Sequence, residues 1–302
     1  MTTTTPKPVQ RFHFDRRQLL EIADAHRESY APAQPFPHIV IDDFLPAGVL
    51  DEVLAEFPSP QRAEWHSFDS PTERKLGTKD DSMLGEATRH LLAEFNSAPF
   101  IDYLERLTGI EGLVPDPHFS GGGLHQIERG GHLKVHADFN RHPHTQLLRR
   151  LNVLVYLNRD WKDEFGGGLE LWSQDMTRRE REILPLFNRC VVFSTTDTSF
   201  HGHPEPLNCP DGMTRKSIAL YYYSSSSGDG VRDHNTLFQP RPGEELPEPD
   251  VDNQPRRQRA KDAARLFLPP ILLSLRGEVR RRRRPAGSAK AGRTPDGHIP
   301  EA

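Results

Sequence analysis

Residues 130–140, which read GGHLKVHADFN, place His132, His136 and Asp138 in an otherwise apolar run. The three positions are separated by even numbers of residues, so on a β-strand their side chains would point to one face. Imidazole and carboxylate groups are metal ligands, and two of them at positions i and i+2 of a strand suffice to hold neighbouring positions around one ion. The segment therefore predicts a strand that carries part of a metal site.

A third ligand has to come from a distant segment, and the sequence offers two candidates. Residues 193–207, FSTTDTSFHGHPEPL, carry His201 and His203 directly after a predicted strand. Two histidines and one carboxylate form the facial triad of non-haem Fe(II) oxygenases, which leaves three coordination positions open for substrates. An H-x-D pair alone occurs often by chance, so the prediction depends on this distant partner.

The next predicted strand adds a binding site for an anion. Residues 215–223, RKSIALYYY, begin with Arg215 and Ser217, again two apart and on one face. A guanidinium group binds a carboxylate through two parallel hydrogen bonds, and a hydroxyl adds a further donor. We therefore expect a carboxylate ligand to lie beside the metal site.

The spacing of apolar residues predicts a β core preceded by helices. Strands are expected where short apolar runs stand between Gly, Pro and Asn clusters, at 124–127, 133–138, 151–157, 169–172, 190–194 and 217–223. Helices are expected at 14–29, 46–58 and 85–96, and in a further helix for which Ser97 is the N-cap. Residues 37–43 are predicted to form a strand and residues 59–81 a polar loop. Helices followed by strands favour a mainly β fold with flanking helices, a sandwich or barrel.

Charge and composition narrow the classes of function. Residues 256–302 contain 13 Lys and Arg against 4 Asp and Glu, whereas the rest of the chain contains 26 against 39. The acidic body argues against a core that binds nucleic acid. Two cysteines, Cys190 and Cys209, form no disulfide framework and suit a reducing compartment. We see no signal peptide and no membrane span, so a cytoplasmic location is expected.

Taken together, the motifs HAD (136–138), FHGH (200–203) and RKS (215–217) resemble the 2-oxoglutarate- and Fe(II)-dependent dioxygenases, in particular their prolyl 4-hydroxylase-like branch. Supporting similarities are PFPHIVIDDFLP (35–46), RRLNVLVYLNRDW (149–161) and FGGGLELW (165–172). The resemblance covers residues 35–225. It implies a double-stranded β-helix, or jelly-roll, with a core at about 110–225 and the N-terminal helices packed outside.

The resemblance also assigns roles to residues. His136, Asp138 and His201 would bind Fe(II), with His201 preferred over His203 because the family pattern places the ligand first. Arg215 would pair with the distal carboxylate of 2-oxoglutarate, assisted by Ser217. Family members often contact this cofactor through a Tyr on the strand before H-x-D. Ile127 takes that place here, so His125 or Asn152 is expected to supply the polar contact.

The implied activity is hydroxylation of an unactivated C–H bond, using O2 and releasing succinate and CO2, with ascorbate as a candidate reductant. The substrate is a prolyl residue, another peptide or a small metabolite. Two alternatives are a catalytically silent cupin-like binding or scaffold protein that acts through its basic tail, and a zinc hydrolase built on the same three ligands. The hydrolase has no evident use for Arg215 and Ser217.

Three parts of the chain are expected: a disordered N-terminus (1–12), the dioxygenase domain (13–228) and a Pro-rich, acidic linker that leads into a basic, largely disordered tail (229–302). Within the tail, a ten-residue apolar run at 266–275 precedes five consecutive arginines at 280–284. It is either a disordered segment or a peripheral contact, through residues 266–284, with a membrane surface or an acidic partner. No specific nucleic-acid partner is expected.

Overall fold

The computed structural model describes residues 12–46, 48–62, 64–78, 81–225 and 233–246. These residues all fall in one unit of the chain, residues 1–247. The predictions for residues 1–12 and 229–302, including the contact through 266–284, lie largely or wholly outside the described residues. The domain boundaries at residues 12 and 228 therefore stay predictions. Within the described residues, no helix is long and apolar enough to cross a bilayer.

Antiparallel strands form one strongly curled sheet in the described part of the chain, in the order β1-β10-β7-β12-β5-β3-β6-β11-β8-β9, with β2 paired to β3, β4 to β12 and β13 to β6. The strands are β1 (His38–Ile41), β2 (Trp65–Asp69), β3 (Glu73–Thr78), β4 (Val114–Pro115), β5 (Gly123–Ile127), β6 (His132–Ala137), β7 (Leu148–Tyr156), β8 (Leu169–Trp172), β9 (Arg179–Ile183), β10 (Cys190–Ser194), β11 (His201–His203), β12 (Arg215–Ser224) and β13 (Leu237–Phe238).

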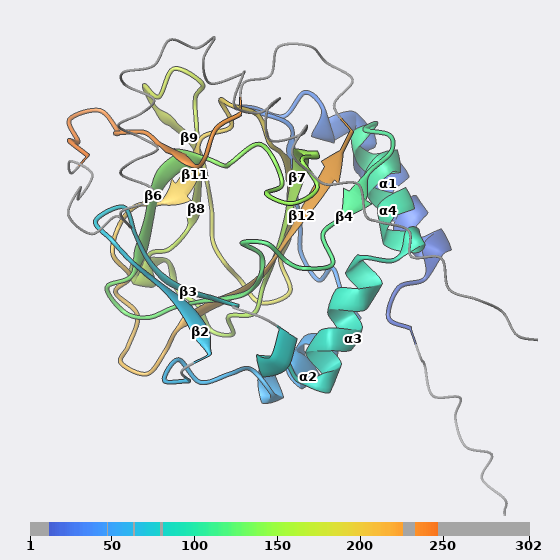
Figure 1. Cartoon of the computed structure of the whole chain (residues 1–302), viewed down its shortest axis with the longest axis horizontal. Helices are drawn as coiled ribbons and strands as arrows, with labels where there is room; N and C mark the ends of the chain where they lie inside the picture. The colour runs from blue at the N-terminus through green and yellow to red at the C-terminus, as the bar shows by residue number, and fades with distance from the viewer. Residues whose placement is uncertain (1–11, 47, 63, 79–80, 226–232, 247–302) are drawn as a thin grey trace, which may run out of the picture. The chain divides into compact units, whose positions relative to one another are not determined.

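The curl brings two groups of strands face to face. In Figure 1, β6, β8 and β11 lie on one side of the interior, and β7 and β12 lie on the other. Strand β3 joins the two groups because it pairs with β5 through Leu76 and Gly77 and with β6 through Glu73 and Arg74. The inner faces of both groups therefore look onto the same space.

Alternating side chains on the central strands separate an apolar outer face from a polar inner face. On β7, Leu151, Val153 and Val155 belong to the main hydrophobic core, whereas Asn152 and Leu154 line an interior cavity. Strand β12 follows the same rule, because Ile218, Leu220 and Tyr222 pack in the core while Arg215, Ser217, Ala219 and Tyr221 line the cavity. Successive side chains of a strand point to opposite faces, so one strand serves both purposes.

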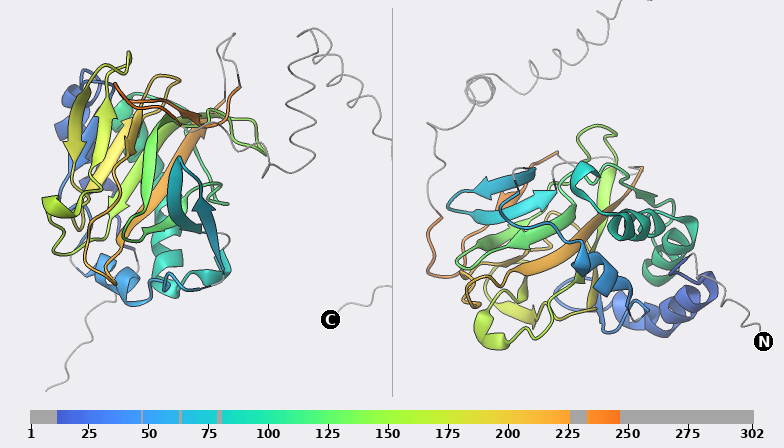
Figure 2. Two further views of the ribbon diagram at one scale, coloured as in Figure 1. Left: turned by 90° about the vertical axis from the view of Figure 1, so that its left-hand side faces the viewer. Right: turned by 90° about the horizontal axis from the view of Figure 1, so that it is seen from below.

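Four helices cover the outer face of this sheet in the described residues: α1 (Arg16–Tyr30), α2 (Val49–Ala55), α3 (Glu86–Phe95) and α4 (Ala98–Thr108). Figure 2 shows them gathered on one side of the strands. Phe95, Phe100 and Tyr103 are buried where α3 and α4 meet the sheet. The predicted arrangement, helices outside a β core, is confirmed. Ser97 does precede α4, but its hydroxyl donates to the carbonyl of Glu94 and makes no cap hydrogen bond.

The predicted loop at residues 59–81 is wrong, because β2 and β3 form a hairpin there. In β2 only Trp65 is buried, and the other side chains are polar or partly exposed, so the apolar alternation that marks a strand is missing. Four further strands, β4, β9, β11 and β13, were also not predicted, and β4 has only two residues. Strand β9 is mostly charged and exposed, and β11 and β13 are too short to show a period.

Candidate metal and co-substrate site

The structure brings the three predicted metal ligands together. His136 lies near the end of β6, Asp138 directly follows that strand, and His201 begins β11 opposite His136. The Nε2 atoms of His136 and His201 lie 3.5 and 3.4 Å from the Asp138 carboxylate oxygens. One ligand atom from each residue lies within 4.8 Å of the others. This is the size of a site in which one ion is bound by all three.

A glycine allows the two strands that carry the histidines to lie this close. A Cβ atom on Gly202 would lie 2.8 and 2.9 Å from the carbonyl oxygens of Leu133 and Lys134 on β6. Any side chain at this position would therefore push β11 away from β6. With glycine there, the imidazole rings of His136 and His201 lie 4.5 Å apart between centroids.

Hydrogen bonds fix which nitrogen of each histidine faces the site. Nδ1 of His136 lies 2.9 Å from the carbonyl oxygen of Lys134, and Nδ1 of His201 lies 2.9 Å from that of Ser199. A carbonyl oxygen only accepts, so Nδ1–H donates in both cases and Nε2 keeps its lone pair for a metal. Burial lowers the pKa of His201 to about 4, although the charge of Asp138 opposes this shift. The lowered pKa favours the neutral imidazole, which is the form that binds a metal.

Asp138 is held by two neighbours that the sequence analysis did not assign to this task. Asn152 donates to Oδ2 of Asp138 at 2.8 Å, and the Arg149 guanidinium lies 3.1 Å from the same oxygen. Burial by itself would raise the pKa of Asp138, but the nearby Arg149 and the two histidines hold it well below its ordinary value. The carboxyl group is thus ionised and oriented, as a metal ligand requires. The donor set fits Fe(II), or another divalent ion that accepts N and O ligands.

An interior cavity extends from this cluster to the buried Arg215. The residues around it include Lys75, His125, Ile127, Leu133, Asn152, His203 and Ser217, besides the three candidate ligands. Arg215 is 5% exposed; its Nε donates to the carbonyl of Gly167, and it has a weak contact of 3.4 Å with the Tyr156 hydroxyl. Among the described residues, Arg215 has no carboxylate partner. A buried guanidinium without an anion is costly, so this end of the cavity fits a carboxylate ligand.

The remaining predicted cofactor contacts line this cavity too. Ser217 lies opposite His125 on β5 and opposite Tyr156 on β7, so the three form one row across the sheet. His125 contacts the carbonyl of Gly121 at 3.1 Å, and burial lowers its pKa to about 3. Asn152 is engaged with Asp138 and Arg149. Contacts of these residues with a cofactor stay predictions.

The sequence analysis missed Arg149 and Lys75, which line the cavity, and Tyr156, whose hydroxyl contacts Arg215. Tyr156 was predictable, because it stands four positions after Asn152 on one strand and shares its face. Arg149 was harder to assign, because two adjacent arginines at the start of a strand usually indicate solvent-exposed side chains. Lys75 was hidden by the wrong prediction of a loop at 59–81. His132, by contrast, contacts the carbonyl of Pro71 and does not line the cavity.

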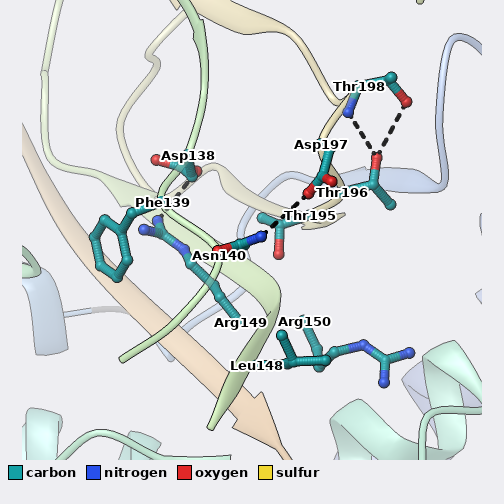
Figure 3. Close-up of a pocket in the computed structure, with 10 residues that line it drawn as sticks. All are labelled: Asp138, Phe139, Asn140, Leu148, Arg149, Arg150, Thr195, Thr196, Asp197 and Thr198. Carbon is teal, nitrogen blue, oxygen red and sulfur yellow. Dashed lines mark hydrogen bonds and ion pairs between the residues drawn. The ribbon is translucent and has the colours of Figure 1, made fainter. Parts of the chain in front are cut away.

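A second, more open cavity of about 510 Å³ is lined by one of the candidate ligands, Asp138 (Figure 3). Asp138 and Arg149 line both cavities, and residues 195–198 form the opposite side of the second one. In Figure 3, the Arg149 guanidinium points to the Asp138 carboxylate at the base of this opening. A substrate bound here would lie next to the candidate metal position.

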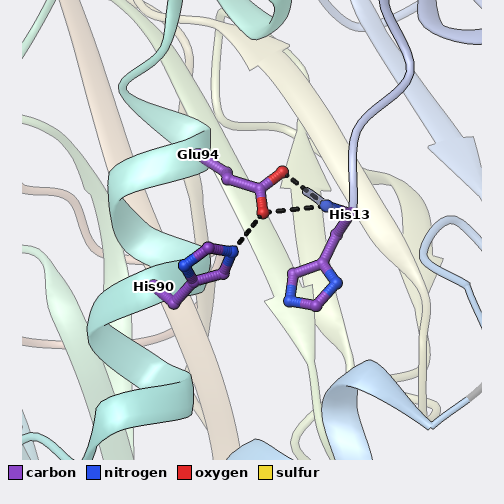
Figure 4. Close-up of side chains that lie close together, drawn as sticks. All are labelled: His13, His90 and Glu94. Atoms are coloured by element: carbon purple, nitrogen blue, oxygen red, sulfur yellow. Dashed lines mark hydrogen bonds and ion pairs between the residues drawn. The ribbon is translucent and has the colours of Figure 1, made fainter. Parts of the chain in front are cut away.

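A second cluster of potential ligands, His13, His90 and Glu94, lies on the helical side (Figure 4). The Glu94 carboxylate accepts hydrogen bonds from the backbone N–H groups of His13 and Phe14, each at 2.8 Å. Nε2 of His90 lies 2.7 Å from Oε1 of the same carboxylate. These partners already occupy both oxygens. The cluster therefore acts as a clamp that fastens the segment before α1 to α3.

Comparison with known proteins agrees with this geometry. Residues 122–223 match the sequence model of the 2OG-Fe(II) oxygenase superfamily. A stretch of 82 residues is 30% identical to mouse prolyl 3-hydroxylase OGFOD1; it makes up 26% of this chain and only 15% of the mouse protein. The structure is similar to a Trichoplax adhaerens prolyl hydroxylase in complex with a hypoxia inducible factor peptide (TM-score 0.51, 18% identity, 69% of this chain and 91% of the other). A Pseudomonas putida prolyl-4-hydroxylase is also similar (TM-score 0.47, 16% identity, 70% of this chain and 100% of the other).

The predicted fold, a mainly β double-stranded β-helix with helices outside, is confirmed by this structural similarity. The similarity to the 2OG-Fe(II) oxygenase superfamily covers residues 122–223, which contain the motifs HAD, FHGH and RKS. Proteins of that superfamily use Fe(II) as a metal cofactor and 2-oxoglutarate and O2 as co-substrates.

Proposed function

We propose that the protein is an Fe(II)- and 2-oxoglutarate-dependent dioxygenase that hydroxylates a C–H bond. The observation that carries this proposal is a single cavity that combines two parts. Three candidate ligands lie within 4.8 Å of one another, and the buried Arg215 has no carboxylate partner among the described residues. His136, Asp138 and His201 would hold the iron, and Arg215 with Ser217 would hold the distal carboxylate of 2-oxoglutarate. When bound, the metal and 2-oxoglutarate supply the activation of O2, with release of succinate and CO2.

The side chains of this protein orient the reactants and exclude water. The carbonyls of Lys134 and Ser199 hold Nδ1 of both histidines, so both Nε2 atoms face the site without rearrangement. Asn152 and Arg149 fix the Asp138 carboxylate. Arg215 is held by the Gly167 carbonyl, which points its remaining N–H groups at a fixed place in the cavity. Preorganised donors of this kind bind a charged ligand in one orientation.

The substrate is proposed to be a peptidyl residue, such as proline, or a small molecule, bound in the cavity lined by Arg149 and residues 195–198. The comparisons support this class, because the similar proteins include a prolyl 3-hydroxylase and a prolyl hydroxylase in complex with a peptide. We further propose ascorbate as a reductant, a cytoplasmic location, and a peripheral contact with a membrane or an acidic partner through residues 266–284.

The proposal is tested by succinate formation from 2-oxoglutarate in the absence of any added substrate. An oxygenase forms succinate slowly under these conditions if Fe(II) and O2 are present. A zinc hydrolase or a silent scaffold protein forms none. Succinate above the level of a His136→Ala, Asp138→Ala variant supports the oxygenase, and equal amounts from both proteins would argue for one of the alternatives.

A further inference from the structure

His203 is a buried histidine with no partner for either ring nitrogen. It lies two residues after the candidate ligand His201 on β11 and is 4% exposed. Among the described residues, neither Nδ1 nor Nε2 of His203 has a hydrogen-bond partner. An unsatisfied buried polar group costs about 1–3 kcal/mol, so such a group needs an explanation.

The surroundings of His203 show what kind of ligand would satisfy it. Its side chain lines the cavity that also contains Arg215 and Lys75. Lys75 is paired with Glu73 at 3.1 Å, whereas Arg215 has no carboxylate partner among the described residues. Asp138 is the one carboxylate among the cavity-lining residues, and Arg149 and Asn152 already hold it. The inner end of the cavity thus contains donors and positive charge without a matching acceptor.

We propose that His203 donates a hydrogen bond to the distal carboxylate of 2-oxoglutarate, beside Arg215, and so helps to select a dicarboxylate. This inference rests on the proposed function and extends it to His203, which is not one of the three candidate metal ligands. A neutral imidazole offers one N–H donor, and a carboxylate offers only acceptors, so the pair is complementary. A hydrogen bond to a charged acceptor is stronger than one between neutral groups.

The experiment measures ligand binding by calorimetry on the full chain, loaded with Mn²⁺ under anaerobic conditions so that no turnover occurs. Two ligands are compared: 2-oxoglutarate, and 2-oxovalerate, which has the same keto acid end but no distal carboxylate. The variants are His203→Leu, which removes the donor, and His203→Gln, which keeps one. His66→Leu is the matched control, because His66 is exposed on β2 and lines neither cavity.

We expect His203→Leu to weaken 2-oxoglutarate binding about 10-fold or more and to leave 2-oxovalerate binding unchanged, with partial recovery in His203→Gln. The ligand-free His203→Leu protein should melt at the same temperature as the wild type or higher, because an unsatisfied polar group has been replaced by an apolar one. A residue with only a structural role would show the opposite, a lower melting temperature and unchanged selectivity.

The possible failures are distinguishable. If the wild-type protein does not bind 2-oxoglutarate, the proposed function itself fails. If the wild type binds it and His203→Leu binds it equally well, the inference about His203 is overturned while the proposed function stands. Equal losses for both ligands in His203→Leu would also overturn it, because they would indicate a general distortion of the cavity.

Discussion

Arg149 packs its guanidinium against the ring of Tyr221, 3.4 Å from the ring centroid, while one of its nitrogens lies 3.1 Å from the carboxylate of Asp138. The side chain of Arg149 is 1% exposed, so this is a buried ion pair at the centre of the candidate site. In the absence of a metal, Arg149 is the main group that compensates the negative charge of Asp138. A bound divalent ion would share that task.

This relationship predicts how Arg149→Met behaves. Removal of one partner from a buried ion pair leaves the other charge uncompensated, which costs about 3–5 kcal/mol. The metal-free variant should therefore unfold at a clearly lower temperature than the wild type. Addition of Mn²⁺ should raise its melting temperature by more than it raises that of the wild type, because the ion then neutralises Asp138. Differential scanning calorimetry with and without metal measures both effects.

Arg150→Met is the matched control, since Arg150 is the next residue and its guanidinium contacts Ser224 instead of Asp138. Its response to metal should equal that of the wild type. An unchanged melting temperature of metal-free Arg149→Met would show that the pair with Asp138 contributes nothing.

Gly202→Ala is predicted to weaken metal binding without removal of any ligand. The added methyl group would meet two backbone carbonyls of β6 at less than 3 Å, so β11 must move away from β6. Overpacking of this kind costs about 1–3 kcal/mol, and it separates His201 from His136. Titration with Mn²⁺ should give a weaker affinity than in the wild type. Wild-type affinity in a folded Gly202→Ala protein would mean that the two strands tolerate the extra atom.

Glu94→Gln is predicted to destabilise the protein and to leave the metal site intact. In Glu94→Gln one carboxylate oxygen becomes an NH2 group that cannot accept a hydrogen bond. The His13 N–H, which donates to both oxygens, then keeps one acceptor at most, and the negative charge that strengthens these hydrogen bonds is lost. A loss of about 1–3 kcal/mol in the free energy of unfolding is expected from denaturant titration. Glu86→Gln, on the exposed face of the same helix, should change it little. A metal-dependent melting temperature in wild type that Glu94→Gln abolishes would instead identify this cluster as a metal site.

The stability that the segment with β13 contributes to the fold should depend on pH, because it involves the ionised carboxylate of Glu244. Burial opposes ionisation of Glu244, but hydrogen bonds from Arg241 and Lys134 outweigh it and lower its pKa to about 2. Because the pKa is lowered in the folded state, the stabilisation is complete above the unfolded value near 4.5 and is lost as pH falls toward 2. The difference in melting temperature between wild type and Glu244→Gln should therefore be constant near neutral pH and shrink below about pH 4.5. A difference that grows on acidification would contradict this account.

The cluster of candidate metal ligands was predictable because the spacing of its residues indicates their chemistry. His136 and Asp138 share a strand face by periodicity alone, and the distant His201 was found through the family pattern. The strands β5, β6, β7, β8, β10 and β12 were also predictable, since their buried faces show apolar residues. Arg149 and Lys75 were not predictable in this way, because a charged residue on a strand reads as exposed until the fold shows that the inner face is polar.

Short and polar strands mark the limit of prediction from this sequence. Strand β13 lies in a segment that was predicted to be a linker, yet Phe238 pairs with His136 and its ring lies 5.6 Å from the imidazole. Two residues cannot establish a period, so only the pairing with β6 shows that this segment lies beside the candidate ligand His136. The role proposed for His203 was also not predictable from the sequence, because only the folded structure shows that its ring nitrogens have no hydrogen-bond partner among the described residues.

The most direct test of the central claim is the release of labelled CO2 from 2-oxoglutarate that carries the label at its C1 carboxylate. The account predicts release that requires both Fe(II) and O2, that stops when a chelator removes the metal, and that falls to the protein-free background in His201→Ala. Release that is independent of Fe(II), or equal in wild type and His201→Ala, would show that His136, Asp138 and His201 do not form the iron site of an oxygenase.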